Sequence, residues 1–332
     1  MPVTDRPWTR TALAVLLLVA GGAAFLSLSG AGPAVAGLTE GPELTSLFAV
    51  ARPLLEASPA DPVAPEPAMR RTGTNQDGWA TYRLAAGRLP DRLQPGTGFR
   101  GEISWLQGDL VRKARVYVPR SADATGAPLL VSLHGLGASL RKVEAQQRWS
   151  TLSTQQGFVL VWGAGYKGSW NAGPCCGFAS REGVDDLGYL DTVLAVSQAL
   201  HAVDPRRVEL AGFSNGAMMA YRYACGRPGR IAGVLAVAGT NTAPCTPSNA
   251  TAVLVVHGSA DPTVPLAGIR YSNSLRTSLP PARRAASQWQ AIGAGVRVVV
   301  LKDFAHGWPT TSKGGFDTTG QGWRFLKAHP RP

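Results

Sequence analysis

The chain has 332 residues, of which 45% are apolar and 16% charged, as expected of a globular protein with one large domain or two small ones. Lys and Arg number 33 against 21 Asp and Glu, which gives a formal charge of +12. The basic residues are scattered along the chain, and no zinc-finger spacing or basic amphipathic helix accompanies them. The charge pattern therefore argues against a nucleic-acid partner.

The first 36 residues have the layout of a secretory signal peptide. Two arginines precede the apolar run TALAVLLLVAGGAAFLSLS, and the small residues Ala34 and Ala36 stand before Gly37. We predict cleavage after Ala36, a secreted (extracellular or periplasmic) location and no stable membrane anchor after cleavage. An uncleaved anchor is the alternative, although glycines and serines interrupt the run.

Residues 37–95 are expected to form an N-terminal extension or linker that is partly disordered. The stretch LTSLFAVARPLLEA has the pattern of one amphipathic helix. The stretch from Ser58 to Pro67 is rich in proline, which neither continues a helix nor donates to a strand ladder.

From residue 96 to the end, apolar strands alternate with helices. GEISWLQGDLVRKARVYVPR predicts an antiparallel hairpin. The predicted strands that follow are PLLVSLHG, FVLVWG, RVELAGF, GVLAVAG, AVLVVHG and GVRVVVLKD, and the predicted helices are VDDLGYLDTVLAVSQAL, GAMMAYRYAC, PPARRAASQWQAIG and DTTGQGWRFLKAHP. This order predicts an α/β fold over residues 96–332: a mostly parallel sheet with helices on both faces and the hairpin at one edge.

Ser214 stands in the G-x-S-x-G pattern GFSNG, between a predicted strand and a predicted helix. The pentapeptide alone is weak evidence in a chain with 39 glycines, but a position between strand and helix is typical of a nucleophile elbow. Gly212 and Gly216 lack the Cβ that would clash where the chain turns sharply. We therefore predict that Ser214 is a nucleophile.

A serine nucleophile needs a base and an acid, which follow it in the order acid, then His, in this class of fold. His306 lies in DFAHGWP, between the last strand and the last helix, and is the predicted base, with His329 as the alternative. Asp261 follows the strand AVLVVHG and is the predicted acid. The rival acids are Asp303, which is close to His306 in sequence, and the pair Asp185/Asp186, which suits a helix N-terminus better.

An oxyanion hole needs two converging N–H donors. One is predicted to be the backbone N–H of Asn215, the residue after the nucleophile. The other is predicted from the loop LHGLGAS, with the N–H of Leu136 preferred and that of Gly137 second. An ordinary turn after a strand is the alternative for this loop.

The four cysteines are Cys175, Cys176, Cys225 and Cys245, an even number in a chain expected to be exported. A bridge between the adjacent pair would strain the peptide that joins them, so we expect two long-range disulfides. Cys225 and Cys245 would each bond one member of the pair, in an order that the sequence does not give. A metal site is disfavoured because the usual C-x₂-C spacing is missing.

The chain resembles the secreted α/β-hydrolase esterases that comprise polyhydroxybutyrate depolymerases, feruloyl esterases and acetylxylan esterases. The resembling segments are VYVPR, PLLVSLHGLGAS, GSWNAGPCCGFASREGVDDLGYL, VDPRRVELAGFSNGAMMAYRYAC, VLVVHGSADPTVP and HGWP. The resemblance implies the α/β-hydrolase fold and carries the catalytic triad of the family onto Ser214, Asp261 and His306. One departure is Ala217, where members of the family often have glycine.

We therefore expect a secreted serine esterase that uses an acyl-enzyme and needs no metal or cofactor. The resemblance implies short-chain hydroxyalkanoate, hydroxycinnamoyl or acetyl esters as substrates. Trp170, beside the cysteine pair, and Trp308, beside the predicted base, are candidates for the walls of the substrate pocket, with core packing as the alternative. The rival functions are a peptidase of the same fold and a non-catalytic or narrowly specific binding protein on the same scaffold.

Overall fold

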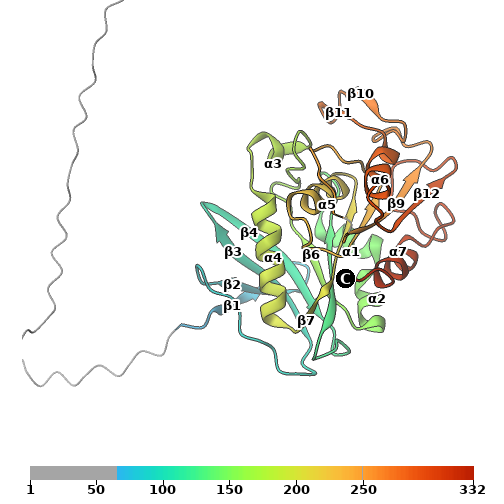
Figure 1. Cartoon of the computed structure of the whole chain (residues 1–332). Coiled ribbons are helices and arrows are strands. Elements are labelled where there is room, and N and C mark those ends of the chain that lie inside the picture. The colour runs from blue at the N-terminus through green and yellow to red at the C-terminus, as the bar shows by residue number, and fades with distance from the viewer. Residues whose placement is uncertain (1–65, 249) are drawn as a thin grey trace, which may run out of the picture. The chain divides into compact units, whose positions relative to one another are not determined.

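The structure, a computed structural model, describes residues 66–332 with the exception of residue 249 (Figure 1). The predicted signal peptide and residues 37–65 of the predicted extension lie outside the described residues. A ten-stranded sheet forms the centre of the described part, in the order β1-β2-β3-β4-β6-β5-β7-β8-β9-β12.

The larger part of this sheet is parallel. It consists of β5 (Ala127–Leu133), β6 (Val159–Gly163), β7 (Val203–Phe213), β8 (Gly233–Val237), β9 (Ala252–Gly258) and β12 (Val296–Leu301). Successive side chains point to opposite faces, so that Leu129 and Val131 enter one apolar cluster and Leu130 the other. Because both faces of β5, β6, β8 and β9 are buried, these four strands are almost continuously apolar, which is why the sequence reveals them. The second half of β7 is buried in the same way, whereas β12 is half-buried.

Helices cover both faces of the sheet, as Figure 1 shows. One face packs against α4 (Asp186–Leu200), α5 (Asn215–Gly226) and α6 (Ala282–Gln290). The other packs against α1 (Leu140–Gln147), α2 (Trp149–Gln156) and α7 (Thr318–Lys327). The helices α1, α2 and α3 (Gly177–Arg181) have no counterpart in the sequence prediction, and neither has the hairpin formed by β10 (Ile269–Ser272) and β11 (Thr277–Leu279).

The antiparallel hairpin predicted near residue 100 is present as β3 (Phe99–Gln107) and β4 (Leu110–Val118). Antiparallel strands lie at one edge of the sheet, as predicted, but β1 (Met69–Thr74) and β2 (Ala80–Leu84) continue the sheet beyond this hairpin. The boundary predicted at residue 96 therefore does not match the structure, since the sheet begins at Met69. Most side chains of β1 are exposed and most of β2 are half-buried, so these strands have no apolar run that a sequence reading could detect.

Candidate active site

Ser214 lies at the sharp turn between β7 and α5. Its backbone has φ 55° and ψ −119°, a conformation that residues with a side chain rarely adopt. A Cβ on Gly212 would overlap the carbonyl of Gly216, and one on Gly216 would overlap the carbonyl of Leu133. The two glycines are therefore required for the turn, and the N-terminus of α5 begins directly after the serine.

His306 and Asp261 lie next to Ser214 in the order that a proton relay needs. His306 Nε2 is 3.0 Å from Ser214 Oγ, and His306 Nδ1 is 2.7 Å from Asp261 Oδ2. A carboxylate only accepts, so Nδ1–H donates to Asp261 and leaves the Nε2 lone pair to accept the serine proton. The alternative base, His329, instead bonds the carbonyl of Phe325.

The carboxylate of Asp261 is buried but well supplied with donors. Its Oδ1 accepts the N–H groups of Thr263 and Val264 at 2.9 and 2.8 Å. Burial acts to raise the pKa of Asp261, but the hydrogen bonds from His306 and from these N–H groups outweigh it and hold the pKa below its usual value. Asp261 is therefore negatively charged at neutral pH and keeps the imidazole of His306 oriented.

A second histidine, His257, packs against the same carboxylate. Its Nε2 lies 2.7 Å from the carbonyl of Val264 and 3.5 Å from Asp261 Oδ2. A carbonyl only accepts, so Nε2 carries the proton, and burial lowers the pKa of His257, which keeps the ring neutral. This residue could not be found from the sequence, because the pattern VHG only marks the end of a strand.

The two predicted oxyanion donors belong to segments that are adjacent to the nucleophile. A Cβ built on Gly135 would lie 3.4 Å from Ser214 Cβ, so the loop that carries Leu136 passes directly beside the serine. Within residues 66–332, no protein acceptor pairs with the backbone N–H of Leu136 or Asn215. The second choice, Gly137, donates its N–H to Gly168 at 2.8 Å and is therefore occupied.

Neither tryptophan proposed as a pocket wall has an open surface. Trp170 is completely buried between His134 and Tyr189, with ring centroids 5.1 and 5.5 Å away. Trp308 is 2% exposed and packs edge-on against Trp149. Both side chains instead pack in the core, which was the alternative interpretation, because the loops that carry them fold inward over the sheet.

Two large apolar side chains are exposed near the oxyanion loop. Leu136 is 43% exposed and Phe178, at the start of α3, is 47% exposed. A Cβ on Gly177 would lie 2.7 Å from Leu136 Cδ1, which shows that the two segments are in contact. Exposure of this kind depends on how loops meet, so it could not be predicted from the sequence.

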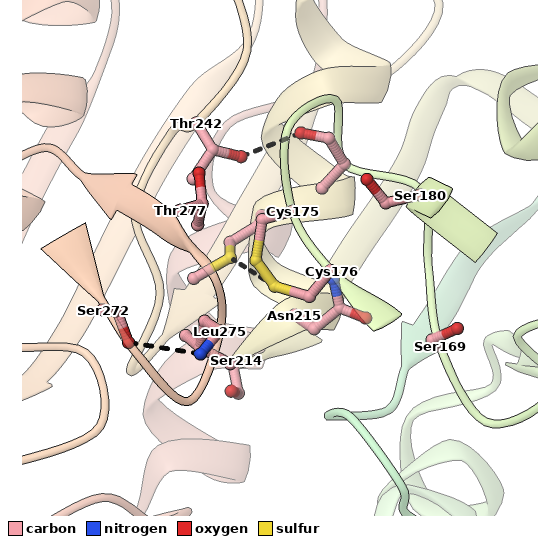
Figure 2. Close-up of a disulfide and its surroundings, with 12 residues drawn as sticks. Ser169, Cys175, Cys176, Ser180, Ser214, Asn215, Thr242, Ser272, Leu275 and Thr277 are labelled. Carbon is pink, nitrogen blue, oxygen red and sulfur yellow. Dashed lines mark hydrogen bonds between the residues drawn. A yellow bond between two sulfur atoms is a disulfide. The ribbon is translucent and has the colours of Figure 1, made fainter. Parts of the chain in front are cut away.

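The disulfides differ from the predicted pairing. Cys225, in α5, bonds Cys245, with their Cα atoms 5.0 Å apart. Cys175 bonds its neighbour Cys176 across a cis peptide, close to Ser214 and Asn215 (Figure 2). The prediction of two bonds between the adjacent pair and the distant cysteines was therefore wrong. It rested on the strain expected in the peptide between the neighbours, and it had no information on how near α5 lies to the loop after β8.

Two negative findings concern the described residues alone. Among residues 66–332 without residue 249, no helix is long and apolar enough to cross a membrane. In the same part of the chain, no cluster of three His, Cys, Asp or Glu side chains could hold a metal ion.

Comparison with known proteins supports the fold. Residues 186–287, about a third of the chain, match the model of the phospholipase/carboxylesterase family. A structure of a thermostable esterase aligns with a TM-score of 0.51 and 16% identity, over 77% of this chain and 70% of that one. The acylaminoacyl peptidase of Pyrococcus horikoshii aligns with a TM-score of 0.50 and 14% identity, over 79% of this chain and 48% of that one. The chain has the α/β-hydrolase fold.

Relatives in sequence carry esterase names. NocK of Nocardia uniformis subsp. tsuyamanensis, which is named as an esterase, is 30% identical over 63% of this chain. A bifunctional acetylxylan esterase/xylanase of Neocallimastix patriciarum is 29% identical over 39% of this chain, and feruloyl esterase B of Piromyces equi is 29% identical over 34%. The chain spans 61% of the length of the first of these relatives, and 18% and 20% of the other two.

Proposed function

We propose that the protein is an exported serine esterase that hydrolyses small carboxylic esters through an acyl-enzyme. The observation that carries this proposal is the continuous hydrogen-bonded series from Ser214 Oγ through His306 to Asp261, at 3.0 and 2.7 Å. The serine is on a strained turn, beside two N–H groups that have no protein acceptor among the described residues. This combination of nucleophile, base, orienting acid and oxyanion donors is what acyl transfer requires.

The reaction follows from these positions. As Ser214 Oγ attacks the ester carbonyl, His306 Nε2 takes its proton, and Asp261 stabilises the imidazolium that forms. The N–H groups of Asn215 and Leu136 bind the negative oxygen of the tetrahedral intermediate. His306 then gives its proton to the departing alcohol, and water repeats the cycle on the acyl-enzyme.

Acetyl, hydroxycinnamoyl and short hydroxyalkanoate esters form the proposed substrate class. Support comes from the names of the relatives, which include an acetylxylan esterase and a feruloyl esterase, and from the resemblance of the sequence to polyhydroxybutyrate depolymerases. Export is proposed from the layout of the first 36 residues together with two disulfides, which persist in oxidising compartments.

The test is hydrolysis of p-nitrophenyl acetate and butyrate, methyl ferulate and a soluble hydroxybutyrate trimer by the chain that begins at Gly37. We expect at least one ester to be turned over, and Ser214→Ala to lower kcat by about 10⁴-fold or more. Ser312→Ala, at an exposed serine in the loop after His306, is the matched control and should behave as wild type. Unchanged turnover in Ser214→Ala would refute the proposal.

A further inference from the structure

The side chain of Asn215 is engaged in a pair of hydrogen bonds that the proposed reaction does not use. Its Oδ1 accepts the backbone N–H of Trp170 at 2.8 Å, and its Nδ2 donates to the carbonyl of Trp170 at 3.0 Å. Asn215 is 1% exposed, so both polar atoms are satisfied only by this backbone. Figure 2 shows Asn215 next to Ser214, below the loop that holds the adjacent cysteines. The residue that follows the nucleophile is therefore fastened to the loop containing Trp170.

The same loop is also fastened to the segment that carries the other predicted donor. The indole Nε1–H of Trp170 donates to the carbonyl of His134 at 2.9 Å. The N–H of Gly165 donates to His134 Nε2 at 2.9 Å, so the proton of this imidazole is on Nδ1, which bonds the carbonyl of Gly135 at 2.7 Å. The N–H of Gly137 donates to Gly168 at 2.8 Å. Residues 165–170 thus hold both ends of the segment 134–137.

Close packing already limits how near the elbow and this segment can come. A Cβ on Gly216 would overlap the carbonyl of Leu133 and lie 2.6 Å from that of His134, so the two backbones are in direct contact. Contact of this kind prevents further approach but does not prevent separation. The hydrogen bonds through Trp170 supply the restraint in the other direction.

We infer that Asn215 and Trp170 are positioning residues that fix the distance between the two oxyanion N–H groups, those of Asn215 and Leu136. The inference rests on the proposed esterase function and deepens it, because it assigns roles to two side chains that do not contact the substrate. It also gives Trp170 a function in place of the predicted pocket wall: its backbone and its indole together link the elbow to the oxyanion loop.

Two substitutions separate the parts of this link. Asn215→Ala removes both bonds to the backbone of Trp170. Trp170→Phe keeps a smaller aromatic ring in the core and the backbone that bonds Asn215, and it removes the indole N–H that bonds His134. Asn241→Ala is the matched control, since Asn241 is 8% exposed and bonds only the N–H of Ala243, at 3.3 Å, within its own loop.

The experiment measures kcat and KM for the best ester of the panel, and the inhibition constant of a trifluoromethyl ketone that carries the same acyl group. Displacing a catalytic hydrogen-bond donor by about 1 Å can lower the reaction rate about 100-fold. We therefore expect Asn215→Ala to lower kcat about 10- to 100-fold, while KM changes less than about threefold. Trp170→Phe should change kcat in the same direction by a smaller factor. The ketone forms an oxyanion on Ser214, so its affinity should fall by the same factor as kcat/KM. Asn241→Ala should leave all three constants unchanged.

The outcomes distinguish the inference from the function on which it rests. Turnover that survives Ser214→Ala removes the esterase proposal itself. If turnover depends on Ser214 but Asn215→Ala keeps kcat and ketone affinity within about twofold of wild type, the inference alone is overturned. A loss of kcat in Asn215→Ala without any loss of ketone affinity, or an equal loss in Asn241→Ala, also overturns it, because both would indicate general damage rather than a displaced donor.

Discussion

Replacement of Arg115 by methionine should destabilise the fold by breaking a buried ion-pair cluster. Arg115 lies on β4 with its side chain 5% exposed, and it pairs with Asp77 at 2.5 Å, Glu144 at 2.6 Å and Glu102 at 2.9 Å. These carboxylates belong to the turn between β1 and β2, to α1 and to β3. One guanidinium therefore joins the two N-terminal strands to the rest of the sheet.

The expected loss follows from the burial of the carboxylates that would remain. Removing one partner of a buried ion pair typically costs about 3–5 kcal/mol, because the other charge is left uncompensated. Lys113 also pairs with Glu102, at 2.9 Å, and the substitution leaves this lysine in place. We therefore expect the lower end of the range, about 3 kcal/mol in the free energy of unfolding. Methionine covers much of the apolar surface that the arginine side chain covers, so the loss in unfolding free energy should be mainly electrostatic.

The assay is urea unfolding of wild type, Arg115→Met and the control Arg141→Met. Arg141 approaches the same Asp77 at 3.8 Å, but its side chain is 81% exposed, so the control should lose less than about 1 kcal/mol. Burial acts to raise the pKa of Glu102, yet Lys113 and Arg115 hold it below its usual value. A carboxyl group whose pKa is lowered by folding stabilises the protein above its unfolded pKa, and this stabilisation is lost on acidification. The difference in unfolding free energy between wild type and Arg115→Met should therefore narrow towards about pH 3. A loss below about 1 kcal/mol at neutral pH, or a gap that does not narrow, would refute this reasoning.

Three further predictions concern the site and the core. Asp261→Asn should lower kcat by about 10⁴-fold with little change in KM, because an amide no longer holds the imidazole in the required tautomer. Ester kinetics measure this effect, and a loss of kcat below about tenfold would contradict the prediction. Burial raises the pKa of Glu209 well above its usual value, so the folded state binds more protons and stability falls as pH rises from the unfolded pKa near 4.5. Glu209→Gln should therefore reduce the fall in unfolding free energy between about pH 4 and pH 8. If this free energy falls equally in wild type and in the variant, the carboxyl group of Glu209 is not buried in its neutral form. Cys225→Ser should cost about 3 kcal/mol in urea unfolding, since the bond to Cys245 closes a loop with a sequence separation of 20; a cost below about 1 kcal/mol would count against it.

The sequence predicts the parallel part of the sheet because most of its strands are buried on both faces and therefore carry apolar runs. It also predicts which residues meet at the site: Ser214, Asp261 and His306 each follow a strand, and parallel strands bring their carboxyl ends to one edge. The positions of these residues relative to the strands carry the information, rather than the pattern G-x-S-x-G alone.

Features that depend on contacts between distant segments were not predictable. The strands β1 and β2 have exposed side chains and are held by Trp79, which is 2% exposed and packs against Trp162, and by the carboxylates around Arg115. Polar strands of this kind have no apolar pattern. The positions of His257 and Trp170 behind the site likewise follow from tertiary packing, because a buried histidine or tryptophan looks the same in a sequence whatever it contacts.

The central claim is that Ser214 is an activated nucleophile, and covalent labelling tests it most directly. Trypsin cleaves after Arg207 and Arg222, so the peptide from Val208 to Arg222 contains Ser214 as its single serine. A fluorophosphonate should add one phosphonyl group to this peptide in the folded wild-type protein, and labelling should be at least about 100-fold slower in His306→Ala. Labelling of a different peptide, no labelling of the folded protein, or equal rates in the two proteins would contradict the account.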